Sequence, residues 1–136
     1  MADLEKSVRT RLLAHVGVSA LVQSGRRVYY AELPKDPKLP AITIQEIGAV
    51  PEGAMGDDCG IALATIQVDA WAASRQDAKD LGEQVRDALQ RYHGTHESSE
   101  LTFIGMIGSG PRRDPPGSRT WRHQQDFEVW FTEAVA

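Results

Sequence analysis

The chain has 136 residues, of which 41% are hydrophobic and 25% charged, so we expect a single soluble domain over residues 1–136. Its 15 Lys and Arg against 19 Asp and Glu give a net charge of -4, which argues against proteins that bind duplex nucleic acid without specificity. Apolar runs far shorter than the roughly 20 residues that cross a bilayer argue against a membrane partner, and the single cysteine, Cys59, excludes an internal disulfide.

The first segment has the periodicity of an amphipathic helix. An apolar residue recurs at every fourth position, which predicts a helix from about Asp3 to Val16 that stops at Gly17. Charge in every turn leaves no apolar core for a signal peptide, so we expect the protein in the cytoplasm. Residues 18–27, VSALVQSGRR, predict a short helical turn. Val28 to Tyr30 predicts a short strand, because β-branched and aromatic residues suit a pleated surface.

Prolines separate this region from the next strand. The stretch LPKDPKLP at 33–40 holds three prolines and predicts an extended surface connection. Apolar and polar residues alternate in AITIQEIG at 41–48, which predicts a strand. The segment AVPEGAMGDDCG at 49–60 carries three glycines, one proline and three acids, so we expect a long loop there.

The middle of the chain combines a strand with a second helix. Residues 61–72 alternate, with Ile66 and Val68 on one face and Gln67, Asp69 and Trp71 on the other. A helix is expected to begin at the cap residue Ser74 and to end at His93-Gly94. Its apolar stripe comprises Ala78, Leu81, Val85, Ala88 or Leu89, and Tyr92.

Two further strands complete the prediction. We expect a polar linker at 95–100, a strand from Leu101 to Ile107, a loop at about 108–118 and a long final strand at 120–132. The order α-β-β-β-α-β-β predicts the α+β class. The expected architecture is a two-layer sandwich with two helices on one face of a mainly antiparallel, four- to five-stranded sheet.

No catalytic or metal site is assigned. His93 and His96 stand three residues apart beside Glu97, but the intervening glycine ends the predicted helix, and the spacing then loses the geometry of a metal pair. Cys59 follows Asp57 and Asp58, whose charges suppress the thiolate that a nucleophile requires. No cofactor-binding motif is present, so we expect no enzyme and no cofactor.

A basic cluster near the C-terminus allows two interpretations. Four arginines, Arg112, Arg113, Arg119 and Arg122, bracket a loop of proline and glycine close to Trp121. Arginine beside an aromatic ring can stack on single-stranded bases, and both residue types are also enriched at protein interfaces. The acidic remainder of the chain favours the protein interface.

The aromatic residues indicate a surface that needs a cover. Trp71 and Trp130 fall on the strand faces opposite to the predicted core, as does Ile47. Helices that pack on one side of a sheet cannot cover the other side. Either the long loops fold over these side chains or a second subunit does, and the candidate interface comprises Trp71, Arg112, Arg113, Trp121 and Trp130.

Three stretches in this order resemble the tail terminator, or tail completion, proteins of long-tailed bacteriophages and gene transfer agents. They are RRVYYAELPKDPKLPAITIQEI, TIQVDAWAASRQDAKDLGEQVRDAL and the closing TWRHQQDFEVWF, and together with the first helix they span nearly the whole chain. One departure is Ala41, where such proteins often carry an aromatic residue after the proline.

The resemblance implies a structural virion protein. It implies a hexameric ring that caps the head-proximal end of the tail tube, stops tube polymerisation and docks neck or head-completion proteins. DNA would then pass through as cargo, and the acidic segment with Glu52, Asp57 and Asp58 would suit the lumen, because negative charge reduces phosphate affinity. The alternatives are another neck or head-tail joining ring protein and a small nucleic-acid-binding module.

Overall fold

The computed structural model describes residues 4–23, 27–35, 37–52, 61–96, 99–113 and 115–132. In these ranges the chain forms three helices, α1 (Leu4–Ala14), α2 (Val16–Leu21) and α3 (Arg75–Leu89). It also forms six strands: β1 (Val28–Tyr30), β2 (Ala41–Glu52), β3 (Ile61–Ala72), β4 (His93–His96), β5 (Ser99–Arg113) and β6 (Trp121–Thr132).

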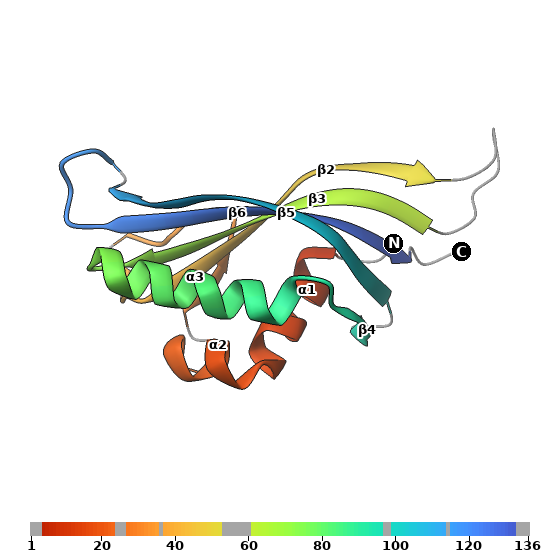
Figure 1. The fold of residues 1–136 in the computed structure, drawn as a ribbon, viewed down its shortest axis with the longest axis horizontal. Helices are drawn as coiled ribbons and strands as arrows, with labels where there is room; N and C mark the ends of the chain where they lie inside the picture. Colours follow the sequence, from red (N-terminus) through yellow and green to blue (C-terminus); the bar gives the residue numbers. More distant parts are fainter. Residues whose placement is uncertain are drawn as a thin grey trace.

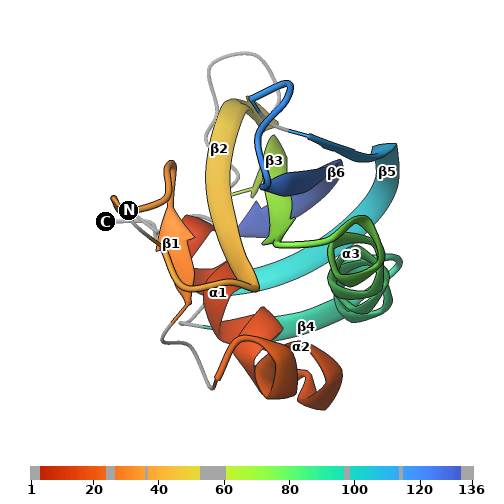
Figure 2. The ribbon, with the colours of Figure 1, turned by 90° about the vertical axis from the view of Figure 1, so that its left-hand side faces the viewer.

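The six strands form one sheet in the order β1-β2-β3-β6-β5-β4. Only β1 and β2 pair in parallel, and all other neighbours are antiparallel. The helices gather on one side of this sheet, below it in Figure 1. Figure 2 shows that the sheet curls strongly around them. The helix layer therefore lies on the concave side, and the opposite side of the sheet faces outward.

Two register shifts typical of β-bulges lie at the same level of the sheet. Pairing of β2 with β3 shifts between Glu46 and Gly48, and pairing of β5 with β6 shifts between Phe103 and Gly105. The register places Gly48, Thr65, Glu128 and Gly105 in one row across the four long strands. A bulge bends its strand and increases the local twist, so the two outer long strands bend together.

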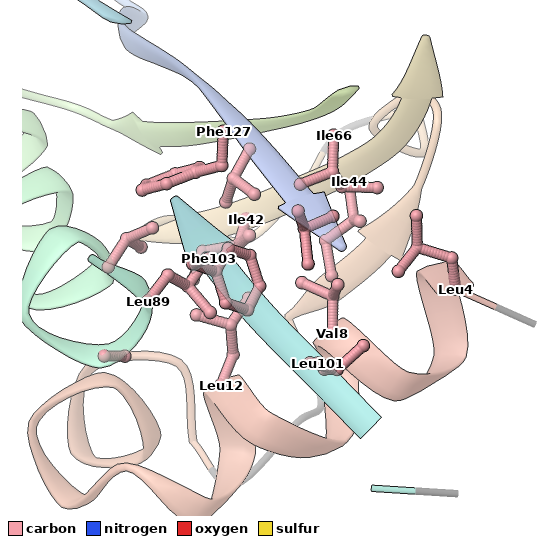
Figure 3. Close-up of a cluster of buried hydrophobic side chains, with 14 of the residues drawn as sticks. Leu4, Val8, Leu12, Ile42, Ile44, Ile66, Leu89, Leu101, Phe103 and Phe127 are labelled. Atoms are coloured by element: carbon pink, nitrogen blue, oxygen red, sulfur yellow. The ribbon is translucent and has the colours of Figure 1, made fainter. Parts of the chain in front are cut away.

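The core lies between the sheet and the helices (Figure 3). Every fourth residue of α1 (Leu4, Val8, Leu12) is buried against the apolar residues of β2, which include Ile42 and Ile44. The rings of Phe103 and Phe127 pack edge to face with 6.0 Å between their centroids. Burial of large apolar side chains supplies the main driving force for folding, and the core residues predicted from periodicity are confirmed here.

Helix α3 approaches β6 closely at Gly82. A Cβ atom built on Gly82 would collide with the His123 ring, and the Gln125 side chain donates a hydrogen bond of 2.9 Å to the Gly82 carbonyl. Burial lowers the pKa of His123, so the ring against the helix is neutral at pH 7. The glycine therefore fixes the distance between the helix and the sheet.

The α+β class with helices on one face is confirmed, but the predicted number of elements is too low. The helix predicted from Asp3 to Val16 is divided at His15, since α1 ends at Ala14 and α2 begins at Val16. The His15 ring caps α2 by accepting a hydrogen bond from the Val18 N–H. The predicted helix end at His93-Gly94 is wrong: α3 ends at Leu89, and Gly94 lies in β4 opposite Leu101. A Cβ atom on Gly94 would strike the Tyr92 side chain, so this glycine serves a close contact instead of a helix cap.

The strands also extend into both segments expected to be loops. β2 continues to Glu52 and pairs there with Ile61, so only 53–60 of the expected 49–60 loop remain, and these lie outside the described residues. β5 continues to Arg113 instead of ending at Ile107. Gly110 lies within a register shift between β5 and β6 and has a φ of 64°, which glycine adopts readily. Pro111 follows in a part of β5 whose outer edge has no neighbouring strand in the described chain, and an edge position of this kind tolerates proline.

We expect Gly82→Ala to destabilise the subunit by about 1–3 kcal/mol, because the new methyl group displaces His123 or pushes α3 away from the sheet. Urea unfolding of the purified chain measures this change. Gly48→Ala is the matched control, since a Cβ atom there meets nothing within 4 Å. Equal stability of the two variants would contradict the close packing.

Candidate subunit interface

The sheet face turned away from the helices is called here the open face. Residues of β3 and β6 alternate between the core and this face, and Ile66 and Phe127 are fully buried on the core side. The open face of these two strands carries Leu63, Thr65, Gln67, Asp69, Trp71, Arg122, Gln124, Asp126, Glu128 and Trp130. No helix in the described ranges covers it (Figure 1).

A buried carboxylate organises one end of the open face. Asp69 is only 4% exposed, and its Oδ2 atom accepts hydrogen bonds from Arg122 Nη2 at 2.9 Å and from Gln67 Nε2 at 2.8 Å. The Trp71 indole donates to Thr43 Oγ1 at 2.9 Å, and the Arg122 guanidinium lies 5.2 Å from the centre of the Trp71 ring. Charge-assisted bonds fix side-chain orientation, so this end presents a rigid polar and aromatic surface.

The five predicted interface residues do not form one cluster. Trp71 and Arg112 flank Arg122 in the register and share one end of the open face. Trp130 is eight residues further along β6, about 26 Å away at the usual strand rise. Arg113 and Trp121 lie opposite each other, with the guanidinium 5.2 Å from the ring centre, on the face that carries the helices.

The exposed apolar residues of this region are isoleucines rather than tryptophans. All three tryptophans are half-buried, whereas Ile47 is 54%, Ile104 49% and Ile107 77% exposed. The sequence reasoning identified Ile47 but missed Ile104 and Ile107, because the β5 bulge interrupts the alternation on which face assignment depends. Ile47 lies on β2, whereas Ile104 and Ile107 lie together on β5 at the other side of the sheet, and exposed large apolar residues of this kind are typical of a surface that another chain covers.

An acidic cavity lies at the level of the two bulges. It has a volume of about 380 Å³ and is lined by Thr65, Gly105, Met106, Ile107, Asp126 and Glu128. Its carboxylates contrast with the arginines at the hairpin end of the same sheet, where Arg112, Arg113 and Arg119 are exposed. On the open face itself, Arg112 and Arg122 lie near the hairpin end and Asp126 and Glu128 lie further along β6, so the charge of this face changes from basic to acidic.

Both long outer strands leave much of their outer edges without a neighbouring strand in the described chain. β1 pairs with β2 only as far as Ile44, and β4 pairs with β5 only as far as Thr102. The next outward N–H groups have local partners: Glu46 donates to the Glu5 carboxylate at 3.0 Å and Phe103 to the Tyr92 carbonyl at 2.9 Å. Beyond these points the strands continue to Glu52 and Arg113.

The remaining predicted positions are placed as follows. His93 hydrogen-bonds Thr102 at 2.7 Å and His96 hydrogen-bonds the Tyr92 hydroxyl at 2.6 Å. No three His, Cys, Asp or Glu residues of the described chain converge as metal ligands, and no helix there has the length and apolar character to span a bilayer. Glu52 ends β2, whereas Asp57 and Asp58 lie outside the described residues.

Comparisons with known proteins give a family and a shared fold. Residues 6–132 match the family described as tail completion protein gp17. No curated protein matches the chain. A chain in the virion of a native gene transfer agent particle has a TM-score of 0.63 and 20% identity, over 95% of this chain and 94% of that chain. A second solved chain, of no stated function, has a TM-score of 0.54 and 7% identity, over 98% of this chain and 99% of that one.

We expect Trp130→Ala to weaken association of subunits more than it weakens folding, because Trp130 lies on the open face and contributes little to the helix-side core. Sedimentation velocity measures association, and thermal melting measures folding. Phe127→Ala is the matched control, since this fully buried ring should cost about 3–5 kcal/mol of folding stability. Equal losses of folding stability in the two variants would make Trp130 an ordinary core residue.

Proposed function

Because the chain belongs to the tail completion protein gp17 family, we propose that it forms a ring, expected to be a hexamer, that caps the head-proximal end of a phage tail tube. In this role the ring stops polymerisation of the tube protein and offers a docking surface to neck or head-completion proteins. The function is structural and requires no catalytic residue or cofactor.

The observation that carries this proposal is the uncovered half of the sheet. The helices bury one face, while the open face, with Trp71 and Trp130, has no helix over it, and the outer edges of β2 beyond Ile44 and of β5 beyond Thr102 have no neighbouring strand in the described chain. The two edges lie on opposite sides of the sheet. Different surfaces on opposite sides of a subunit suit a head-to-tail contact, which generates a ring when the rotation closes.

The fold shared with a chain of the gene transfer agent virion supports a place in a virion. We infer that the protein is made in the cytoplasm of the bacterial host and assembles there onto the tail. Its partners in this account are further copies of itself, the tail tube protein and the neck proteins.

The acidic segment fits the same proposal. A tail ring must let DNA slide through without holding it, and negative charge lowers the affinity of a surface for phosphate. Glu52 ends a strand at the sheet margin, and Asp57 and Asp58 follow it in sequence. We therefore assign these three acids to the lumen of the ring, with DNA only as transiting cargo.

A nucleic-acid-binding module is less well supported. Base stacking needs aromatic and basic side chains on one platform. Arg112 lies on the open face, whereas Arg113 and Trp121 lie on the helix side, so the basic cluster is divided between two faces. Another neck or head-tail joining ring remains the alternative, because it would need the same uncovered sheet.

Deletion of the gene should leave overlong tails that do not join heads, because nothing then stops the tube from growing. Electron microscopy of lysates measures tail length and attachment, and expression of the intact chain in trans is the control. Tails of normal length that fail to join heads would identify the neck alternative. Normal, joined tails would contradict both roles.

A further inference from the structure

The outer edge of β5 has the composition of a strand that another strand covers. From Leu101 to Pro111 the sequence LTFIGMIGSGP contains no charged residue. Ile104 and Ile107 are exposed there, and β4 leaves the strand unpaired beyond Thr102. Monomeric proteins protect free edges with charge, proline or short length. Of these protective features, β5 has a proline, Pro111, and two charged residues, Arg112 and Arg113, and all three lie at its C-terminal end.

A second free edge lies on the other side of the sheet. β2 loses its parallel neighbour after Ile44, bulges at the exposed Ile47 and continues to Glu52. Acidic side chains accompany this edge, since Glu5 from α1 binds the Glu46 backbone and Glu46 itself is exposed. Basic side chains accompany the other edge, where Arg112 and Arg113 are exposed. The two edges are thus complementary in charge.

Strand direction decides how the edges can meet. β2, β3, β6 and β5 alternate in direction, so β2 and β5 run antiparallel to each other within one subunit. Rotation about a ring axis preserves strand direction along that axis. The β5 strand of the next copy would therefore arrive antiparallel to β2 and would continue the antiparallel order of the sheet. We propose that the outer edge of β5 in one copy pairs with the outer edge of β2 in the next.

The positions of the free stretches set the register of this pairing. Gly48 and Gly105 lie at one level, but the free part of β2 extends toward Glu52 and that of β5 toward Arg113, at the opposite end of the sheet. Facing residues of paired strands share one face of the sheet, so full overlap requires an even shift, of about six residues or roughly 20 Å. This shift places Glu46, which lies on the helix side opposite Ile66, across from Arg113 of the next copy, which also lies on the helix side. A closed barrel requires such a stagger between its strands.

The inference rests on the proposed ring, and cross-linking in assembled tails tests it. In a Cys59→Ser background, Glu46→Cys with Arg113→Cys should form disulfides between neighbouring copies under oxidation, giving a series of bands up to the full ring on a non-reducing gel. Facing residues of adjacent strands approach closely enough for a disulfide. Glu46→Cys with Met106→Cys is the matched control for an unshifted register, because Met106 lies level with Glu46 across the sheet, and it should give at least fivefold less product.

Tail length in the same samples separates the two proposals. Tails of normal length without intersubunit disulfides in either double variant would overturn the edge pairing and leave the terminator role intact. Dimers from Arg113→Cys or Met106→Cys alone would also overturn it, because they indicate a two-fold contact between β5 strands. Overlong tails from the Cys59→Ser variant without added cysteines would show that this substitution itself impairs tail termination. The disulfides would then be measured in purified rings.

Charge exchange tests the pairing without cysteines. Glu46→Arg and Arg113→Glu should each reduce ring formation about tenfold at low salt, because like charges then face each other across the contact. The double variant should recover most of the loss. Arg119→Glu, an exposed arginine of the hairpin loop, is the control and should change ring formation less than twofold. A double variant no better than the single ones would contradict the Glu46–Arg113 register.

Discussion

A single layer of helices can bury only one face of a β-sheet, and this constraint governs the rest of the structure. α1 and α3 take the concave side, where Ile44, Ile66 and Phe127 are fully buried. Every strand that crosses the core must then present its alternate residues outward. Trp71 and Trp130 are on the outward side because their neighbours in sequence are needed inside. The uncovered surface is therefore a direct consequence of how the core is built.

The open face is ordered despite its lack of a cover. Asp69 accepts hydrogen bonds from Arg122 and Gln67, and Trp71 donates one to Thr43. These side chains are therefore held in one conformation by contacts within the subunit. A preorganised surface loses less side-chain freedom when it binds. The two bulges bend the long strands at one level and expose Ile47 and Ile104 at the edges. Rigid faces and free edges together favour assembly of the subunit.

The helices and strands in which apolar residues recur at a regular spacing were predictable from the sequence, and the elements that depend on tertiary contacts were not. The strand at 61–72 and the helix capped by Ser74 follow from local spacing. β4 was missed because Gly94 is a helix stop by local rules, whereas its role depends on the Tyr92 ring. The end of β5 was missed because its glycines and proline become a strand only through pairing with β6.

The candidate interface was predictable only in part, for the same reason. Alternation alone placed Trp71 and Trp130 away from the core. The partner of Trp71 in the surface cluster is Arg122, which is brought near by pairing of β3 with β6 over 51 positions of sequence. Exposure of Ile107 depends on a bulge that no local pattern shows. Contacts between distant strands thus determine which predicted residues share a surface.

Hydrogen exchange tests most directly whether neighbouring subunits complete this sheet. In the free subunit, the outward amides of β5 between Ile104 and Arg113 should exchange rapidly, because no strand of the described chain pairs with them. In assembled tails they should exchange at least tenfold more slowly, while α3 changes little. Equal rates for these β5 amides in the free and assembled protein would contradict the account.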